Sequence, residues 1–155
     1  MPVVGVATTP VILTRAQVRM FMRDRADKNI LLDDVQFTDD ELNFAMDMAA
    51  ETFNAVTPQT NILPQSMNKY VLLLGTVKFL LMSESFLQVR NQASYQDGEI
   101  SPIGIDDKMA QYSQMAQSIK AEWDELVRGI KTQNNMESAY NRLGSGYRNV
   151  SRNNR

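Results

Sequence analysis

The stretch DDKMAQYSQMAQSIKAEWDELVRGIKTQN, residues 106–134, carries the clearest periodic pattern in the sequence. Its large and apolar side chains recur at alternating steps of three and four residues: Met109, Tyr112, Ala116, Ile119, Trp123, Leu126 and Ile130. This spacing places them on one face of an α-helix over about three heptads. We predict one long helix, capped by Asp106 and ending at about Asn134, that lies antiparallel to another helix or against a second subunit.

A preceding helix is expected from about Gln65 to Arg90. Residues 71–82 are apolar on nearly all sides, which is typical of a helix surrounded by others, so we place this helix at the centre of the fold. Gly75 costs such a helix about 1 kcal/mol relative to Ala, and we expect a neighbouring backbone to approach it closely. The apolar run contains Lys78 and falls short of the roughly 18 residues of a membrane span, so we expect no membrane contact.

Two helix starts are marked by capping boxes, in which a Thr side chain and a residue three positions later satisfy each other's backbone N–H groups. Thr14 with Gln17 predicts a helix over 15–25, and Thr38 with Glu41 predicts one over 39–53. In the first of these helices we expect three buried side chains: Val18, Phe21 and Met22.

The remaining segments lack a helical pattern. Residues 1–13 contain Pro2 and Pro10 among Val residues and suit an extended arm. Residues 93–101 indicate a β-hairpin around Asp97-Gly98, a pair that tolerates the positive φ of a type I′ turn. The predicted fold class is therefore mainly α: a small four-helix bundle over 1–134, with a short β-hairpin before the last long helix, the extended N-terminal arm, and an extended, basic C-terminal arm over 135–155.

The composition excludes several kinds of chemistry. The chain has 155 residues, enough for one domain with a sizeable core, and it contains neither Cys nor His. Disulfides, thiolate nucleophiles, Cys/His zinc sites and imidazole bases are therefore excluded, and carboxylate, Ser/Thr or Lys chemistry remains.

Three acidic clusters are the candidates for acid–base or metal chemistry: Asp33 with Asp34, Asp39 with Asp40 and Glu41, and Asp106 with Asp107. The last two stand where helices begin, and acidic residues in a first turn satisfy free N–H groups and the helix dipole. Asp33 and Asp34 have the pattern of a loop turn. Capping and turn formation explain the clusters without catalysis; a divalent cation is the alternative, although no EF-hand spacing is present.

The C-terminal arm differs in charge from the rest of the chain. Residues 135–155 carry four Arg and one Glu, net +3, while residues 1–134 carry net −5. Such an arm cannot make its own core and suits contacts with another copy or a larger partner. Contact with nucleic acid through Arg and Tyr, and an arm without a partner, are the alternatives. The residues proposed for docking are Tyr140, Arg142, Tyr147, Arg148, Arg152 and Arg155.

Several short segments together resemble the head-tail connector (adaptor) proteins of tailed bacteriophages. The resemblance covers most of the chain from Leu13 to about Tyr147 and rests on the order of helices and short signatures. These signatures are Leu13-Thr14, Arg23-Asp24-Arg25, residues 29–32 (NILL), residues 37–42 (FTDDEL), residues 72–76 (LLLGT), Arg90-Asn91, residues 95–98 (YQDG), Lys131 with Asn134, and Ala139-Tyr140. Residues 1–12 match no pattern of the family.

The resemblance implies a non-enzymatic virion protein of the neck, between capsid and tail, that is assembled in the host cytoplasm without cofactors. It would form a homo-oligomeric ring, a dodecamer, under the portal protein, extend the DNA channel and bind tail or head-completion proteins. Its C-terminal segment would reach the portal, and genomic DNA would pass without specific binding. If Asp33, Asp34, Asp39 and Asp40 face the channel, their charge would repel the phosphates. The alternatives are a nucleic-acid-binding packaging module, similar to a small terminase subunit, and a carboxylate-based metal enzyme.

Overall fold

The protein is mainly helical. The computed structural model describes residues 12–29, 34–95 and 108–150, and these ranges contain four α-helices, one short 3-10 helix and no strand. In chain order the helices are α1 (Arg15–Met22), α2 (Asp39–Ala55), η1 (Pro64–Ser66), α3 (Lys69–Tyr95) and α4 (Lys108–Val150). The mainly α class is thus confirmed. The predicted N-terminal arm lies outside the described residues up to position 11.

Both predicted capping boxes are present. The Thr38 backbone N–H donates to Glu41 Oε2 at 2.7 Å, the Glu41 N–H donates to Thr38 Oγ1 at 3.3 Å, and Thr14 and Gln17 make the equivalent pair of bonds. The end of α1 was predicted three residues too late, at Arg25. The helix ends at Met22 because Arg23 takes a left-handed conformation, with φ of 59°, and its N–H bonds back to the last turn.

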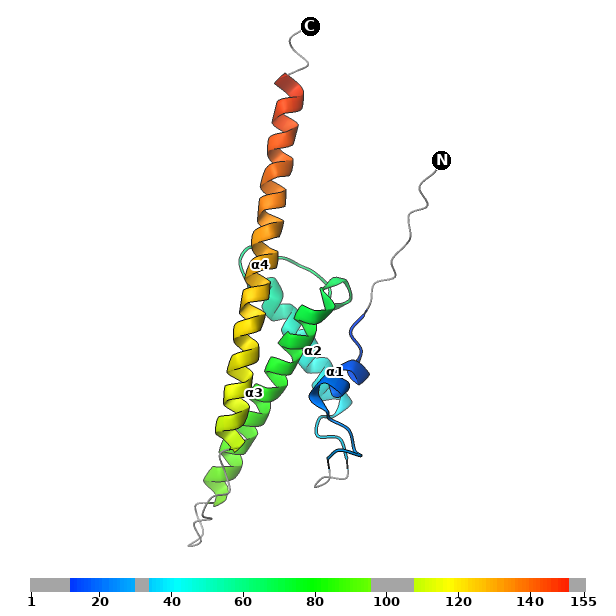
Figure 1. The fold of residues 1–155 in the computed structure, drawn as a ribbon, viewed down its shortest axis with the longest axis vertical. Helices are drawn as coiled ribbons and strands as arrows, with labels where there is room; N and C mark the ends of the chain where they lie inside the picture. Colours follow the sequence, from blue (N-terminus) through cyan, green and yellow to red (C-terminus); the bar gives the residue numbers. More distant parts are fainter. Residues whose placement is uncertain (1–11, 30–33, 96–107, 151–155) are drawn as a thin grey trace, which may run out of the picture.

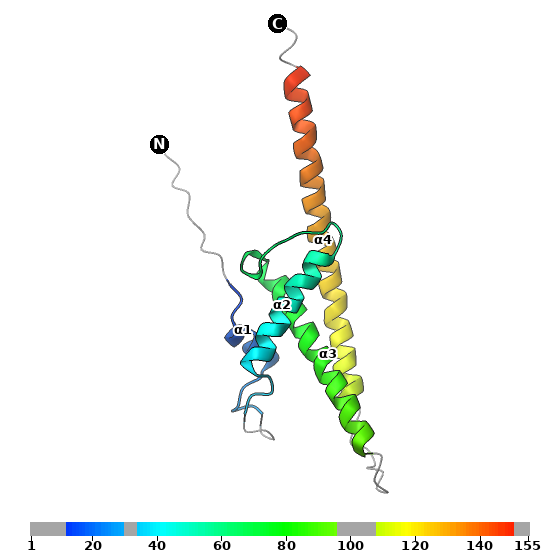
Figure 2. The ribbon, with the colours of Figure 1, turned by 180° about the vertical axis from the view of Figure 1, so that it is seen from behind.

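α3 is the central helix, as predicted. Figures 1 and 2 show α4 running antiparallel along one side of α3, while α2 crosses it on another side and α1 lies against it on a third. Side chains are accordingly buried around the whole helix from Val71 to Leu81. The helix begins four residues after the predicted start, at Lys69, where the Asn68 side chain accepts the N–H groups of Tyr70 and Val71.

The C-terminal part of α3 corrects the predicted hairpin. The helix continues to Tyr95, so a hairpin beginning at Ala93 is wrong, because residues 93–95 belong to the last helical turn. Its remaining residues, 96–101, lie outside the described residues, as does the predicted cap Asp106 of α4.

The length of α3 also corrects the membrane argument. Lys69–Arg90, with a mean hydropathy of 1.5, is long and apolar enough to cross a membrane by length and composition, so the shortfall expected from the sequence is wrong. Of its most apolar window, 56% is buried inside the protein, and the core helix of a folded bundle meets the same criterion.

The periodic face of α4 packs on α3, which is one of the two partners, a helix of the same chain or a second subunit, that the spacing left open. Ala116, Trp123 and Val127 are buried there, and Ile119 and Leu126 are partly buried against the same core. Trp123 occupies the space beside Gly75, and its indole N–H donates to the Val71 carbonyl at 3.1 Å. Gly75 is closely approached, as predicted, but by the side chains of Ala49 and Trp123, so the predicted approach of a backbone is wrong.

Burial in α1 agrees only in part with expectation. Val18 is fully buried and Met22 is partly buried, whereas Phe21 is 49% exposed and was wrongly predicted to be buried. With eight residues, α1 turns too few side chains toward the core to bury a third large one.

The end of α4 is the largest departure from expectation. The helix was predicted to end at about Asn134 and to be followed by an extended arm, but it continues for sixteen residues to Val150. A helix satisfies its backbone hydrogen bonds locally, so a segment without a core of its own can extend a helix that the core has already nucleated. Gly144 and Gly146 each weaken the helix by about 1 kcal/mol relative to Ala but remove no hydrogen bond, unlike Pro.

Candidate partner-binding surfaces

The first candidate surface is the part of α4 that extends beyond the other helices. We call residues 132–150 the projecting segment and the other described residues the body; Figure 1 shows the segment rising past the ends of α2 and α3. Every side chain from Thr132 to Ala139 is exposed, including Met136 at 52%. The segment is therefore a preformed helix whose described side chains are available for contact.

Four of the six residues predicted for docking lie on this projecting segment. Tyr140, Arg142, Tyr147 and Arg148 are all within the helical backbone of α4, and the two Tyr are seven residues apart, about two helical turns. Arg152 and Arg155 lie outside the described residues. Four of the residues singled out from the sequence thus share one element, but as part of a helix rather than of an extended arm.

The base of the projecting segment is fixed by a lysine that the sequence argument did not single out for this role. Lys131 is 2% exposed, and its ammonium donates to the Pro58 carbonyl at 2.9 Å and to Thr60 Oγ1 at 2.6 Å. The same ammonium lies 4.4 Å from the centroid of the Phe53 ring. Burial lowers the pKa of Lys131 below its ordinary value. These contacts join α4 to the end of α2 and to the loop after it.

A groove lies beside this joint. It has a volume of about 520 Å³ and runs between the loop at 56–58 and α4, from Trp123 past Arg128 to Met136. The groove therefore continues from the body onto the first turn of the projecting segment. Its charged side chains are Asp124, Arg128 and Lys131, and Thr57, Thr132 and Asn135 add uncharged polar groups.

A second buried lysine lies on α3, beside the ring of Trp123. Lys78 on α3 is 5% exposed, and its ammonium is 3.8 Å from the centroid of the Trp123 ring and 4.8 Å from that of Phe79. Burial is the main cause that lowers the pKa of Lys78, and the charge of Asp124 partly opposes this effect. The lysine had been noted from the sequence only as a charge within an apolar run.

Three of the four carboxylates expected to face a channel lie within the described residues. Asp34, Asp39 and Asp40 are exposed near the start of α2, whereas Asp33 lies outside the described residues. Asp39 pairs with Arg19 Nη2 at 2.9 Å and with Arg15 Nη1 at 3.1 Å, and the hydrogen bond from Arg19 holds the pKa of this carboxyl below its ordinary value. The structure thus brings three of the four carboxylates to one end of the body, but next to cations that reduce the negative charge of this end.

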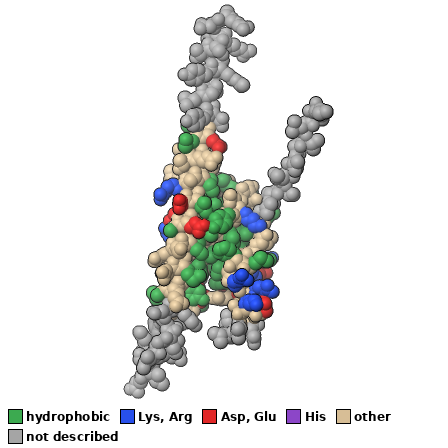
Figure 3. Space-filling model, in the orientation of Figure 1, with side chains coloured by type: hydrophobic (Ala, Val, Ile, Leu, Met, Phe, Trp, Pro, Cys, Tyr) green, Lys and Arg blue, Asp and Glu red, His purple; other side chains and the backbone are tan. Residues whose placement is uncertain are grey.

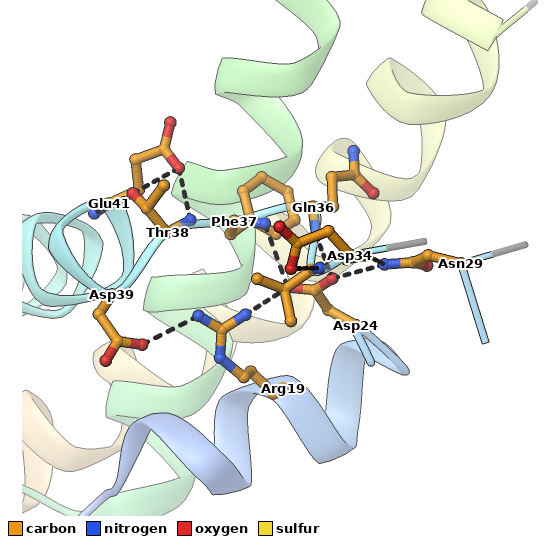
Figure 4. Close-up of polar contacts among 10 residues, drawn as sticks. Arg19, Asp24, Asn29, Asp34, Gln36, Phe37, Thr38, Asp39 and Glu41 are labelled. Carbon is orange, nitrogen blue, oxygen red and sulfur yellow. Dashed lines mark hydrogen bonds and ion pairs between the residues drawn. The ribbon is translucent and has the colours of Figure 1, made fainter. Parts of the chain in front are cut away.

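A buried carboxylate organises the same end of the body. Asp24 is 4% exposed and accepts hydrogen bonds from the side chains of Arg19 and Asn29, at 2.8 and 2.9 Å, and from the backbone N–H groups of Gln36 and Phe37, at 2.6 and 3.2 Å (Figure 4). It thereby fixes the chain between α1 and α2. The sequence did not indicate that Asp24 is buried, because Arg23-Asp24-Arg25 has the pattern of an exposed charged turn.

The acidic side chains of the described residues do not form a metal-binding cluster. Among them, no group of three or more Asp or Glu side chains could hold a metal ion. The acidic first turn of α2 is explained by the capping box of Thr38 and Glu41 and by the ion pairs of Asp39. Asp106 and Asp107 lie outside the described residues.

Comparison with known proteins adds no relative. No model of a known protein family matches the sequence, and neither a curated protein nor a solved structure matches it. A functional assignment therefore rests on the residues of this chain and on their geometry.

Proposed function

We propose that the protein is a structural component of a tailed-bacteriophage virion, a head-tail connector (adaptor) located in the neck. In this proposal the four helices form a bundle in each subunit, and the subunits form a dodecameric ring under the portal protein after synthesis in the host cytoplasm. The ring extends the DNA channel and provides the platform for tail or head-completion proteins. The protein acts without catalysis, cofactor or membrane.

The projecting segment is the observation that carries this proposal. A helix that leaves the body with every described side chain from Thr132 to Ala139 exposed has surface to offer to another protein. Because its backbone is already helical, binding orders fewer degrees of freedom than the folding of an extended arm would. Repetition around a ring would add avidity to each small contact.

The test uses purified capsids that carry a portal but no tail, mixed with the full chain or with residues 1–134. We expect the full chain to add density under the portal and the truncated chain to add none. A matched control replaces Arg25, an exposed arginine of the body that belongs to neither the groove nor the projecting segment, with Gln and should bind as the native chain does. Failure of the full chain to bind these capsids, or equal binding by residues 1–134, would refute the proposal.

The exposed acidic residues belong to the same proposal. Asp34 and Asp40 would face the channel and repel passing DNA, whereas Asp39 contributes less because Arg15 and Arg19 neutralise it. Asp33 keeps the role inferred from the sequence. Particles with Asp34→Asn and Asp40→Asn should retain or eject DNA differently from native particles, and unchanged DNA retention and ejection would remove the channel assignment.

A nucleic-acid-binding packaging module, similar to a small terminase subunit, is the second candidate. The Arg positions on the outer part of α4 favour it, since a helix bearing Arg can follow a phosphate backbone. This candidate predicts DNA binding that is lost in residues 1–134 and whose affinity falls steeply with salt, with a slope of about −0.9 per phosphate contacted. The connector proposal expects no specific DNA binding.

A further inference from the structure

The antiparallel pair of α3 and α4 has two opposite sides that differ in chemistry. On α4, Met115, Ile119, Glu122 and Leu126 recur at helical steps along one side. Lys120 is two residues from Glu122, about 200° around the helix, and so lies near the opposite side. We call these two sides the tyrosine face and the phenylalanine face, after the exposed aromatic residue that α3 contributes to each.

The tyrosine face combines exposed apolar side chains with negative charge. Tyr70 is 47% and Met115 54% exposed, and the Tyr70 hydroxyl donates to Glu122 Oε1 at 2.6 Å, which ties α3 to α4 on this side. This hydrogen bond raises the pKa of Tyr70. Figure 3 looks onto this side and shows hydrophobic side chains gathered over α3 between α4 and α1. Glu125 adds a second exposed carboxylate one turn from Glu122.

The phenylalanine face combines exposed apolar side chains with positive charge. Met82, Phe86 and Val89 stand at helical steps of four and three residues on α3 and are 39%, 71% and 43% exposed. Beside them a groove of about 240 Å³ reaches α4 at Ala116 and Lys120. Figure 2 shows why this part is uncovered: α2 crosses only the N-terminal half of α3.

The charges of this second face are set by α4. Lys120 pairs with Asp124, and the exposed Arg128 follows one turn later, so the cations exceed the carboxylates on this side. An exposed apolar stripe on a monomer is typical of an interaction site. Here its charge is opposite in sign to that of the tyrosine face of the same chain.

We propose that the tyrosine face of one copy binds the phenylalanine face of a second copy. Both faces are apolar at their centres and opposite in charge, which is the complementarity that a pair of specific partners shows. Because the two faces differ and lie on opposite sides, the contact is heterologous, and every copy can bind one neighbour on each side. Closure of this repeat into a ring rests on the proposed function, whereas the contact itself does not.

The test blocks one face at a time. Phe86→Glu places a negative charge on the phenylalanine face, and Met115→Lys places a positive charge on the tyrosine face, so each variant repels the face it would meet. Two matched controls make the same changes at other exposed positions, outside both faces: Phe44→Glu on α2, 66% exposed, and Met20→Lys on α1, 70% exposed. Circular dichroism confirms that all four variants are folded, and sedimentation velocity gives the species formed.

We expect the native chain and both controls to form oligomers larger than a dimer, and each face variant alone to need at least tenfold higher concentration to associate. An equal mixture of the two face variants should associate at the native concentration, because one intact face of each kind remains and the two substituted faces carry opposite charges. Association of either variant alone at the native concentration, no association in the mixture, or a monomeric native chain would overturn the inference. Capsid binding by a chain that does not self-associate would overturn this inference alone, and self-association without capsid binding would overturn only the proposed function.

Discussion

At the scale of single residues, the position of Trp123 depends on the absence of a side chain at Gly75. A Cβ atom built there would lie 2.8 Å from Ala49 Cβ and 2.9 Å from Trp123 Nε1. Ala would improve the helix by about 1 kcal/mol, but overpacking a filled core costs about 1–3 kcal/mol. We expect Gly75→Ala to lower the free energy of unfolding by about 1 kcal/mol, measured by urea denaturation followed by circular dichroism.

Gly129 provides the control for this change. It is also inside a helix, but a Cβ atom there meets nothing within 4 Å, so Gly129→Ala should raise the free energy of unfolding by about 1 kcal/mol. If Gly75→Ala stabilised the protein as Gly129→Ala does, the close packing of Trp123 against α3 would be contradicted.

Lys78 should give the stability a dependence on pH. Because burial lowers its pKa in the folded protein, the unfolded chain binds more protons than the folded chain between that lowered pKa and 10.5. The free energy of unfolding contributed by this group therefore rises with pH in that window, as loss of the proton removes the cost of burying the charge. The Lys78→Met variant lacks this contribution, so the native chain should gain stability relative to it between pH 7 and pH 10.

The measurement is urea denaturation at both pH values, followed by the fluorescence of Trp123, the single tryptophan of the chain. The difference between the two proteins cancels the other groups that titrate in this range. A difference that stays constant, or that changes in favour of Lys78→Met, would contradict the burial of a charged Lys78.

At the scale of elements, Asp24 joins α1 to the segment that leads into α2. Its carboxylate accepts four hydrogen bonds, and Asn at this position would turn an amide N–H₂ toward some of those donors. We expect Asp24→Asn to lower the free energy of unfolding by about 2–3 kcal/mol. Asp39→Asn removes the other carboxylate that binds Arg19, but Asp39 is exposed and screened by solvent, so its loss should cost much less than the loss of Asp24.

Thermal unfolding of both variants measures this difference. Asp39→Asn is a matched control, since it makes the same chemical change in another carboxylate that binds Arg19. Equal losses of stability in Asp24→Asn and Asp39→Asn would show that the buried network does not fix this end of the body.

The elements that the sequence predicted well are those whose signals are local. The boxes of Thr14 and Thr38 set two helix starts correctly because both partners of each cap lie within four residues. The ends of α1 and α4 were misjudged for opposite reasons. α1 ends because Arg23 takes a left-handed backbone conformation, which its residue type did not predict. α4 continues beyond Asn134 because the polar residues there extend a helix that begins in the core.

At the scale of the whole molecule, the body contains the buried core, and the projecting segment extends beyond it. Lys131 is the last residue of α4 known to be buried, and all side chains from Thr132 to Ala139 are exposed. We expect residues 1–134 to unfold cooperatively, with a free energy within about 0.5 kcal/mol of the full chain. Urea denaturation measures this value, and a loss of more than about 2 kcal/mol would show that the projecting segment contributes to the core.

The candidate surfaces could be predicted from the sequence only where composition marks them. The Arg and Tyr positions of the last twenty residues stood out because they contrast with an acidic chain. The anchoring role of Lys131 did not stand out, since its partners Pro58 and Thr60 are more than 70 residues away in sequence. The two faces of the α3–α4 pair could not be predicted either. Their exposure depends on which parts of α3 the other helices cover, and no local sequence pattern contains this information.

Because α4 is one continuous helix, its length sets how far its C-terminal end stands from the body. Lys131 fixes the lower part, and each residue beyond it adds about 1.5 Å of height and about 100° of rotation, so Val150 stands about 28 Å above the anchor. Insertion of seven residues would raise the tip by about 10 Å with almost the same orientation, whereas two residues would turn it by about 200° with a change in height of only about 3 Å. The height of the helix tip and the direction in which its side chains point can therefore change separately in evolution, through insertions of different length in one helix.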